Sequence, residues 1–133
     1  MSAKLFLRIA AVVMLLHAVG HTMGALSWKK APNTAVAQVI NGMQNQHFDF
    51  MGRSASLADF YNGYGISMIF VLLLVSVLLW LLAANPVKNM LVTLGLFLLG
   101  LAICEYVYFF AFAAVFSLTA AICVWLARLK TSA

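Results

Sequence analysis

Charged side chains are the scarcest feature of this sequence. Only 8% of its 133 residues are Asp, Glu, Lys or Arg, whereas about a quarter of an average soluble domain is charged. Hydrophobic residues make up 65% of the chain, and the mean hydropathy is +1.04. Such a composition leaves too little polar surface for a protein surrounded by water. It excludes an ordinary soluble domain and predicts an integral membrane protein.

Acidic residues and cysteines are few, and their scarcity excludes further classes. The net charge of +5 comes without a basic stripe or interleaved aromatic residues, so we expect no nucleic-acid partner. The two cysteines, Cys104 and Cys123, fall on different expected spans and form no CxxC motif. A disulfide between them and thiol redox chemistry are therefore not expected, and no cofactor is predicted.

Four apolar stretches are long enough to cross a membrane, because a hydrocarbon core about 30 Å thick requires roughly 20 residues per helix. We therefore predict an all-α fold, a four-helix transmembrane bundle that forms a single integral membrane domain over residues 1–133. The turn between the last two spans is expected near residues 107–113. The expected spans are residues 5–27, 57–84, 89–108 and 111–129. The first could also begin a signal peptide, but its apolar run exceeds the usual 7 to 15 residues, and we expect it to be retained.

The long loop between the first two spans, residues 28–56, is the only substantial polar segment. Within it four apolar residues recur with helical spacing after the start signal Asn33–Thr34, which predicts a short helix on the membrane surface. Phe48, Phe50 and Met51 are expected to dip into the same interface. The four helical positions are Val36, Val39, Ile40 and Met43.

The distribution of basic residues predicts the orientation. Four spans place both termini on one side, which collects five basic residues against three on the other, so the positive-inside rule places both termini in the cytoplasm of a plasma (inner) membrane. All three acids and all three histidines then fall in the outer half. The five basic residues on the side of the termini are Lys4, Arg8, Lys88, Arg128 and Lys130, and the three on the other side are Lys29, Lys30 and Arg53.

The segment HAVGHTMG, residues 17–24, places two histidines within the first span. At 100° per residue His17, Gly20, His21 and Gly24 share one helix face, and the GxxxG spacing allows another helix to approach. We therefore expect this face to point toward protein, and the Gly20/Gly24 face is a candidate for a homo-oligomer or a membrane partner. Each imidazole either bonds a neighbouring helix or takes part in function.

Glu105 is the only acid deep in a span. Counted from the outer helix ends, His21, Asn62 and Glu105 come to similar depths, and a carboxyl with an imidazole at one level would suit acid–base chemistry. The alternative for Glu105 is a solvated residue of the turn. The sequence SLAD at residues 56–59 predicts a capping box at the start of the second span, in which Asp59 is the N3 partner of Ser56.

The stretch LFLRIAAVVMLLHAVGHTMG carries a family resemblance. With a basic residue early and glycines late in its first span, the chain resembles small four-span bacterial inner-membrane proteins called DoxX-like. That family is functionally mixed, with members linked to quinone or thiol redox systems. The resemblance therefore implies a bacterial inner-membrane setting more than an activity.

These observations predict an outer-leaflet polar pocket that binds a small lipophilic or amphipathic molecule, with possible acid–base chemistry. One alternative is a non-catalytic accessory or scaffold subunit of a membrane complex. Another is a metal-binding protein in which the HxxxH pair, His17 and His21, supplies the first ligands. The predicted site consists of His21 and Glu105 as acid and base, with His17, Asn62, Asp59 and His47 as binding residues.

Overall fold

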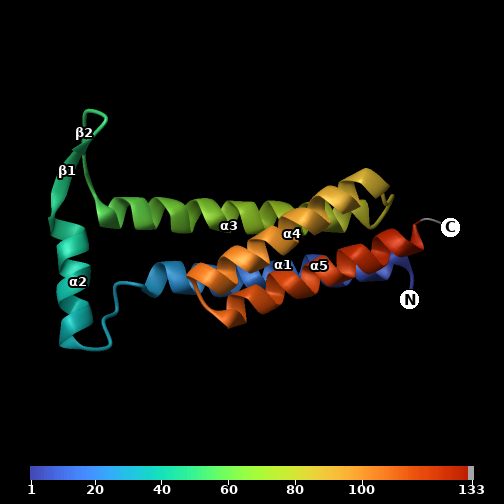
Figure 1. Cartoon of the computed structure of the whole chain (residues 1–133), viewed down its shortest axis with the longest axis horizontal. Coiled ribbons are helices and arrows are strands. Elements are labelled where there is room, and N and C mark those ends of the chain that lie inside the picture. The colour runs from blue at the N-terminus through green and yellow to red at the C-terminus, as the bar shows by residue number, and fades with distance from the viewer. Residues whose placement is uncertain (132–133) are drawn as a thin grey trace. The chain divides into compact units, whose positions relative to one another are not determined.

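The computed structural model describes residues 1–131 and contains helices with one small sheet (Figure 1). Four long helices are joined by short connections, except that the segment between the first two also carries a short helix and a β-hairpin. The elements are α1 (Ala3–Ser27), α2 (Thr34–Asn45), β1 (His47–Phe50), β2 (Arg53–Ser56), α3 (Leu57–Leu82), α4 (Lys88–Tyr108) and α5 (Ala111–Lys130).

Helices α1, α3, α4 and α5 are each long and apolar enough to cross a membrane. Their bounds lie within a few residues of the four predicted spans, so the prediction of an all-helical chain with four such helices is confirmed. Many of their large apolar side chains are exposed, among them Phe70, Leu81 and Leu129. Such surfaces are compatible with an integral membrane protein, because lipid tails are as apolar as leucine.

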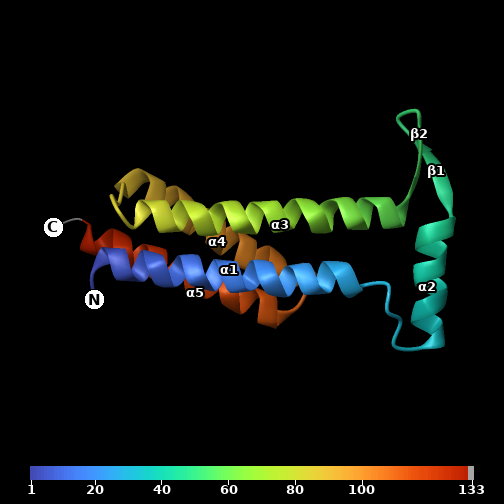
Figure 2. The same ribbon diagram turned by 180° about the vertical axis from the view of Figure 1, so that it is seen from behind.

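The chain divides into two compact units. The first unit comprises residues 1–18 together with the described residues from 71 onward, and the second comprises residues 19–70. Helices α1 and α3 are continuous ribbons that contribute to both units (Figure 2). That the whole chain forms a single domain stays a prediction.

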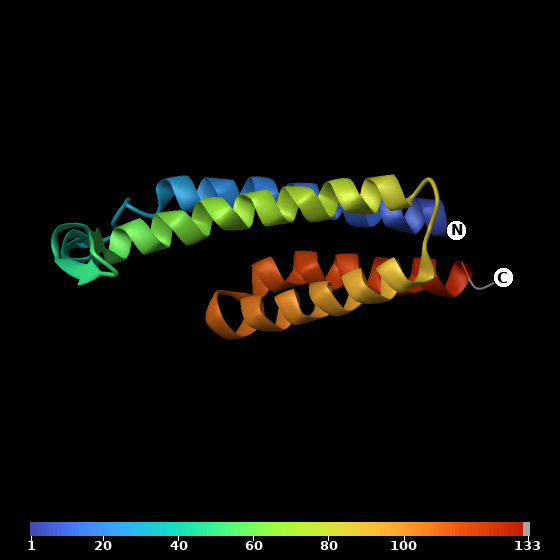
Figure 3. The same cartoon turned by 90° about the horizontal axis from the view of Figure 1, so that it is seen from above.

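In the first unit α4 and α5 are antiparallel neighbours (Figure 3). Leu91 and Leu98 of α4 and Val124 of α5 are fully buried. The indole of Trp125 lies so close to Gly95 that an added Cβ would be 2.9 Å from its Nε1 atom. The hydroxyl of Ser76 on α3 donates to the carbonyl of Ala11 on α1 over 2.8 Å. Close packing and hydrogen bonds between helices therefore hold this unit together.

The turn between α4 and α5 is short. Helix α4 ends at Tyr108 and α5 begins at Ala111, which confirms the turn expected near residues 107–113. The N–H of Phe109 donates to the carbonyl of Glu105 over 3.0 Å and closes the last turn of α4. Glu105 therefore belongs to the helix and not to the turn.

In the second unit helix α2 begins where the sequence signals a start. The side chain of Asn33 accepts the N–H of Val36 over 2.9 Å, as an N-cap residue does. The helix continues to Asn45. Ile40 is its one buried residue. The position of α2 on a membrane surface stays a prediction.

Strands β1 and β2 form an antiparallel hairpin that the sequence did not predict. Its turn is Met51–Gly52, and both residues have positive φ, 53° and 80°. Tight hairpins use such turns because their twist matches that of the strands, but they favour Asn or Asp before the glycine. Methionine at this position conceals the signal. Phe48 and Phe50 share one face of β1, and both rings contact Phe60 of α3, with centroids 6.0 and 5.1 Å away.

Candidate functional site

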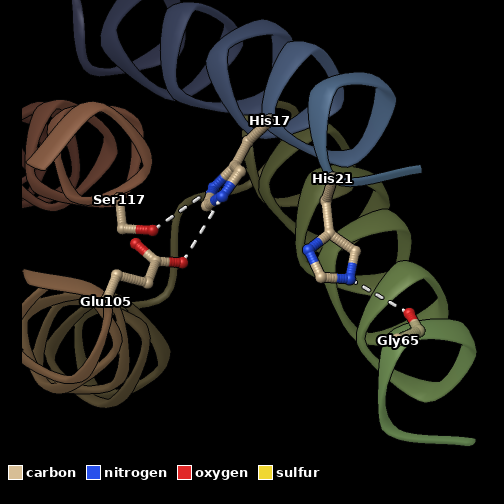
Figure 4. A network of polar contacts seen from close by, with 5 residues as sticks. All are labelled: His17, His21, Gly65, Glu105 and Ser117. Atoms are coloured by element: carbon tan, nitrogen blue, oxygen red, sulfur yellow. Dashed lines mark hydrogen bonds and ion pairs between the residues drawn. The ribbon is translucent and has the colours of Figure 1, made fainter. Parts of the chain in front are cut away.

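The polar cluster of the first unit is centred on His17. This residue of α1 is only 5% exposed, although it lies in the middle of a highly apolar helix. Its two ring nitrogens face two other helices (Figure 4): Nε2 lies 3.4 Å from Oε1 of Glu105 on α4, and Nδ1 lies 3.4 Å from Oγ of Ser117 on α5. One imidazole thus connects three helices.

Glu105 is buried in the last turn of α4, with 7% of its surface exposed. The alternative of a solvated turn residue is therefore wrong. The sequence interpretation paired this carboxyl with His21, whereas the histidine that contacts it is His17. Its second oxygen, Oε2, is buried and has no hydrogen-bond partner within residues 1–131. A buried polar atom without a partner is costly, and the Ser117 hydroxyl is the neighbouring side chain that bonds to this carboxyl group.

Ser117 and Phe116 complete the surroundings of His17, and sequence analysis identified neither. Ser117 is completely buried, and its hydroxyl faces both the imidazole and the Glu105 carboxyl group (Figure 4). The ring of Phe116 stacks on the imidazole with centroids 5.5 Å apart, and Phe112 meets Phe116 edge-on. The available signal was a pair of hydroxyl side chains, Ser117 and Thr119, within an apolar span, and such residues more often serve helix packing.

The proton between His17 and Glu105 can lie on either side chain. In the first arrangement, protonated His17 donates Nε2–H to the Glu105 carboxylate and Nδ1–H to the Ser117 hydroxyl oxygen. In the second, that Nε2 proton has moved to Glu105, which donates it back to Nε2, while Nδ1–H still donates to Ser117. The serine oxygen accepts a hydrogen bond in both arrangements. Glu105 and His17 can therefore exchange a proton without leaving either ring nitrogen unpaired.

The order Ser117, His17, Glu105 also has the outline of a hydrolase triad, in which a histidine lies between a nucleophile and a carboxylate. Two features oppose that interpretation. The Ser117 hydroxyl has no exposed surface. It also lies within α5, where backbone N–H groups bond within the helix and are not available as an oxyanion hole. The arrangement suits proton exchange better than acyl transfer.

His21 belongs to the second unit and has a different partner. Its Nε2 donates to the backbone carbonyl of Gly65 on α3 over 3.0 Å (Figure 4). A carbonyl can only accept, so the hydrogen bond requires a proton on Nε2. A Cβ at Gly65 would meet Ala25 at 3.4 Å, an ordinary contact. His21 thus joins α1 to α3 through an interhelical hydrogen bond.

Asn62, also in the second unit, is engaged by a tryptophan that sequence analysis did not single out. Its Oδ1 accepts the indole N–H of Trp28 over 2.8 Å, and the Trp28 ring packs on Tyr61 with centroids 4.7 Å apart. An aromatic side chain with a polar tip is typical of membrane interfaces. One face of Asn62 is thereby used for anchoring the end of α1 to α3.

The other predicted binding residues, Asp59 and His47, have local roles. Asp59 Oδ2 accepts the Ser56 N–H and hydroxyl over 2.9 and 3.0 Å, and the Ser56 oxygen accepts the Asp59 N–H over 3.2 Å. This confirms the predicted capping box at the start of α3. His47 is exposed on β1, and its Nδ1 donates to the carbonyl of Asn45 over 3.2 Å.

The glycines of the HAVGHTMG segment are open rather than packed. Gly20 and Gly24 are exposed, and a Cβ at either would meet nothing within 4 Å. The expectation that this whole face packs against protein within the chain is therefore wrong for the glycines. Within the described part of the chain no group of three or more His, Cys, Asp or Glu side chains could hold a metal ion. Cys104 and Cys123 are free thiols.

The fold and this cluster define a class: a helical protein with four potential membrane spans and an ionisable cluster where three of them meet. Comparison with protein-family models, with curated proteins and with solved structures found no significant match. The resemblance to DoxX-like proteins therefore stays a prediction. Function has to be argued from the chemistry of the cluster.

Proposed function

We propose that this is an integral membrane protein that binds a small lipophilic or amphipathic molecule at His17 and Glu105 and exchanges a proton with it. The observation that carries the proposal is the buried pair itself. An ionisable residue within a span is expensive and commonly marks a proton or substrate pathway. Here two ionisable side chains from different helices lie 3.4 Å apart.

The geometry favours His17 over His21 as the partner of Glu105. His17 Nε2 faces the Glu105 carboxyl group, whereas the Nε2 proton of His21 is engaged by a backbone carbonyl. Glu105 Oε2 is the atom that a ligand would contact, since it is buried and makes no geometrically well-formed hydrogen bond among the described residues; the ligand would compete there with the Ser117 hydroxyl. Ser117 then acts through His17 by fixing the ring orientation, which makes it a positioning residue.

The chemistry of the cluster limits the kind of ligand. Oε2 accepts a hydrogen bond when Glu105 is ionised and can donate one when it is protonated. The surrounding side chains, including Phe116, are apolar. A suitable ligand therefore has one hydroxyl, carbonyl or similar polar group on an otherwise apolar body, and it can reach the site through the lipid.

The membrane placement of the chain is part of this proposal. Both termini lie in the cytoplasm of an inner membrane, since five basic residues belong to that side against three on the other. Helix α2 and the hairpin then lie at the outer interface, where Phe48, Phe50 and Met51 contact lipid. Met51, at the tip of the hairpin, is 93% exposed.

The test is to identify molecules that co-purify with the protein. Wild type and the variants Glu105→Gln and His17→Ala are purified in mild detergent, and organic extracts of each are compared by mass spectrometry. We expect a small lipophilic compound at near-stoichiometric amount in wild type and its loss from both variants. His21→Ala is the matched control, because it removes an imidazole from the same helix outside the cluster, and it should retain the compound.

Circular dichroism and gel filtration must show that all three variants stay folded. A compound retained equally by Glu105→Gln and wild type would refute the proposal, and so would the absence of any compound from folded wild type after reconstitution in total lipid extract. Metal analysis of the same samples tests the HxxxH alternative, for which zinc or iron bound to wild type and lost in His21→Ala is required.

A scaffold role is the second candidate, and the open glycines favour it. A face with Gly20 and Gly24 and no contact within 4 Å permits close approach of another helix. Under this alternative Gly20→Leu removes an oligomer or a co-purifying membrane partner, whereas Glu105→Gln leaves both in place. Under the binding proposal, Glu105→Gln removes the bound compound, whereas Gly20→Leu leaves it in place.

A further inference from the structure

The basic end of the first unit carries a feature that the proposed function does not use. The start of α1, the end of α5 and the α3–α4 connection lie at one end of this unit (Figure 1). Residues 1–18 and 71–133 contain a single acid, Glu105, which lies at the opposite end of α4 from this connection. Among the described residues of this unit, no Asp or Glu side chain therefore lies at its basic end. Its basic residues are Lys4, Arg8, Lys88, Arg128 and Lys130.

Arg8 is the most distinctive of these residues. It lies in the second turn of α1, is exposed, and its guanidinium carbon is 5.0 Å from the ring centroid of Trp80 in the last turn of α3. A guanidinium over an aromatic ring is attracted to the ring by its charge and still has five N–H donors in one plane. Two of these donors can bond to two oxygens of a phosphate group.

A second pair of the same kind lies in the same unit. Arg128, in the last turn of α5, has its guanidinium carbon 5.8 Å from the Trp125 ring, which in turn packs on Gly95. Tryptophan is enriched at the level of lipid headgroups. The two arginines are thus held by tryptophans on helices that end at this side, and Arg128 adds positive charge to the surroundings of Arg8.

The neighbours of Arg8 and Trp80 indicate that the anion has an apolar body. Leu5, Val77 and Leu81 are large apolar residues with 44%, 54% and 62% of their surfaces exposed. They come from the same two helices as the Arg8–Trp80 pair. A free phosphate would use only the arginine, whereas a phospholipid places its phosphate on Arg8 and its acyl chains along this apolar surface.

We infer that Arg8, held against Trp80, together with the basic end of the first unit, is a binding site for the headgroup of an anionic phospholipid. The charge favours a lipid with a net negative headgroup over a zwitterionic one. A basic residue near an anionic membrane surface contributes about 1 kcal/mol, so losing Arg8 should weaken binding about five-fold. The site is separate from His17 and Glu105, and it stands or fails independently of the proposed function.

The experiment measures which lipid the full-length protein retains. Protein is incubated with an equimolar mixture of phosphatidylglycerol and phosphatidylcholine in detergent, and bound lipid is counted by native mass spectrometry. Wild type should prefer phosphatidylglycerol, and Arg8→Gln should lose about five-fold of that preference. Arg8→Lys, which keeps the charge without the planar edge, should lie between them. Lys30→Gln removes the same charge outside the first unit and should behave as wild type.

Three results would overturn the inference. An unchanged preference in folded Arg8→Gln would exclude the arginine, and an equal loss in Lys30→Gln would show that net charge alone is responsible. Displacement of phosphatidylglycerol by inorganic phosphate at equal concentration would show a simple anion site instead of a lipid site. If Arg8→Gln fails to fold, Trp80→Leu is used, because it removes the ring that holds Arg8 and should reduce the preference.

Discussion

Replacement of Gly95 by alanine tests the closest contact that a described glycine makes with another helix. Gly95 lies on α4, and the Trp125 indole of α5 covers it. An ideal Cβ at this position would be 2.9 Å from Nε1 and 3.0 Å from Cε2 of that indole. Favourable contacts between such atoms require about 3.5–4.0 Å. The added methyl group must therefore push the indole or the helix α5 away.

The expected cost follows from comparison with a second glycine of the same helix. Overpacking of a well-packed site typically costs about 1–3 kcal/mol. Alanine also gains about 1 kcal/mol over glycine in a helix interior. At Gly100 a Cβ meets nothing within 4 Å, so Gly100→Ala receives only the gain. The difference between the two variants, about 1–3 kcal/mol, isolates the packing against Trp125.

The assay is reversible unfolding in mixed detergent micelles, followed by far-UV circular dichroism as the denaturing detergent is increased. Gly95→Ala should have a lower free energy of unfolding than Gly100→Ala. Trp125→Phe lacks the indole nitrogen nearest to the new methyl group, so the cost of Gly95→Ala should fall by about 1 kcal/mol in that background, within the usual range of couplings between contacting residues.

Equal or greater stability of Gly95→Ala relative to Gly100→Ala would refute this account of the α4–α5 contact. An undiminished cost in the Trp125→Phe background would also refute it, because the clash would then not involve the indole edge.

Two further predictions concern hydrogen bonds. Ser76→Ala removes the hydroxyl that donates to the Ala11 carbonyl and should lower the free energy of unfolding by about 0.6–1.7 kcal/mol. Ser67→Ala, at an exposed position of α3, is the control and should change the free energy of unfolding little. Equal effects of the two variants in the same detergent titration would show that the Ser76–Ala11 hydrogen bond does not stabilise the protein. Ser56→Ala removes the cap of α3 and should cost about 0.5–2 kcal/mol, with faster amide hydrogen exchange in the first turn. Ser54→Ala, in the same strand β2, is its control. Unchanged amide hydrogen exchange in Ser56→Ala would show that the cap does not stabilise the first turn of α3.

Structural features that depend on a pattern of neighbouring residues could be predicted from the sequence. The four apolar runs fixed the long helices to within a few residues, because a span requires a continuous apolar stretch. The SLAD capping box and the turn at residues 109–110 were also predicted. Local signals of this kind depend on neighbouring residues only, so tertiary packing does not alter them.

Side-chain contacts between different helices could not be predicted from the sequence in this way. Depth was counted as if all helices ended at one level, but α4 has 21 residues and α1 has 25. That assumption matched Glu105 with His21, whereas the contact is with His17. Ser117 was missed because the two hydroxyl residues of this apolar helix, Ser117 and Thr119, form no helical repeat that points to a site. The hairpin was missed because Met51 occupies a left-handed position that methionine rarely adopts.

The short distance between His17 and Glu105 has an electrical consequence. One elementary charge moved across the whole membrane changes in energy by about 2.3 kcal/mol per 100 mV. The two atoms lie 3.4 Å apart, so a transferred proton crosses less than about a tenth of a hydrocarbon core roughly 30 Å thick, even if it moves along the membrane normal. The transmembrane voltage therefore biases the transfer by no more than about 0.3 kcal/mol per 100 mV. The state of the pair should follow its chemical surroundings and remain nearly indifferent to the energised state of the membrane.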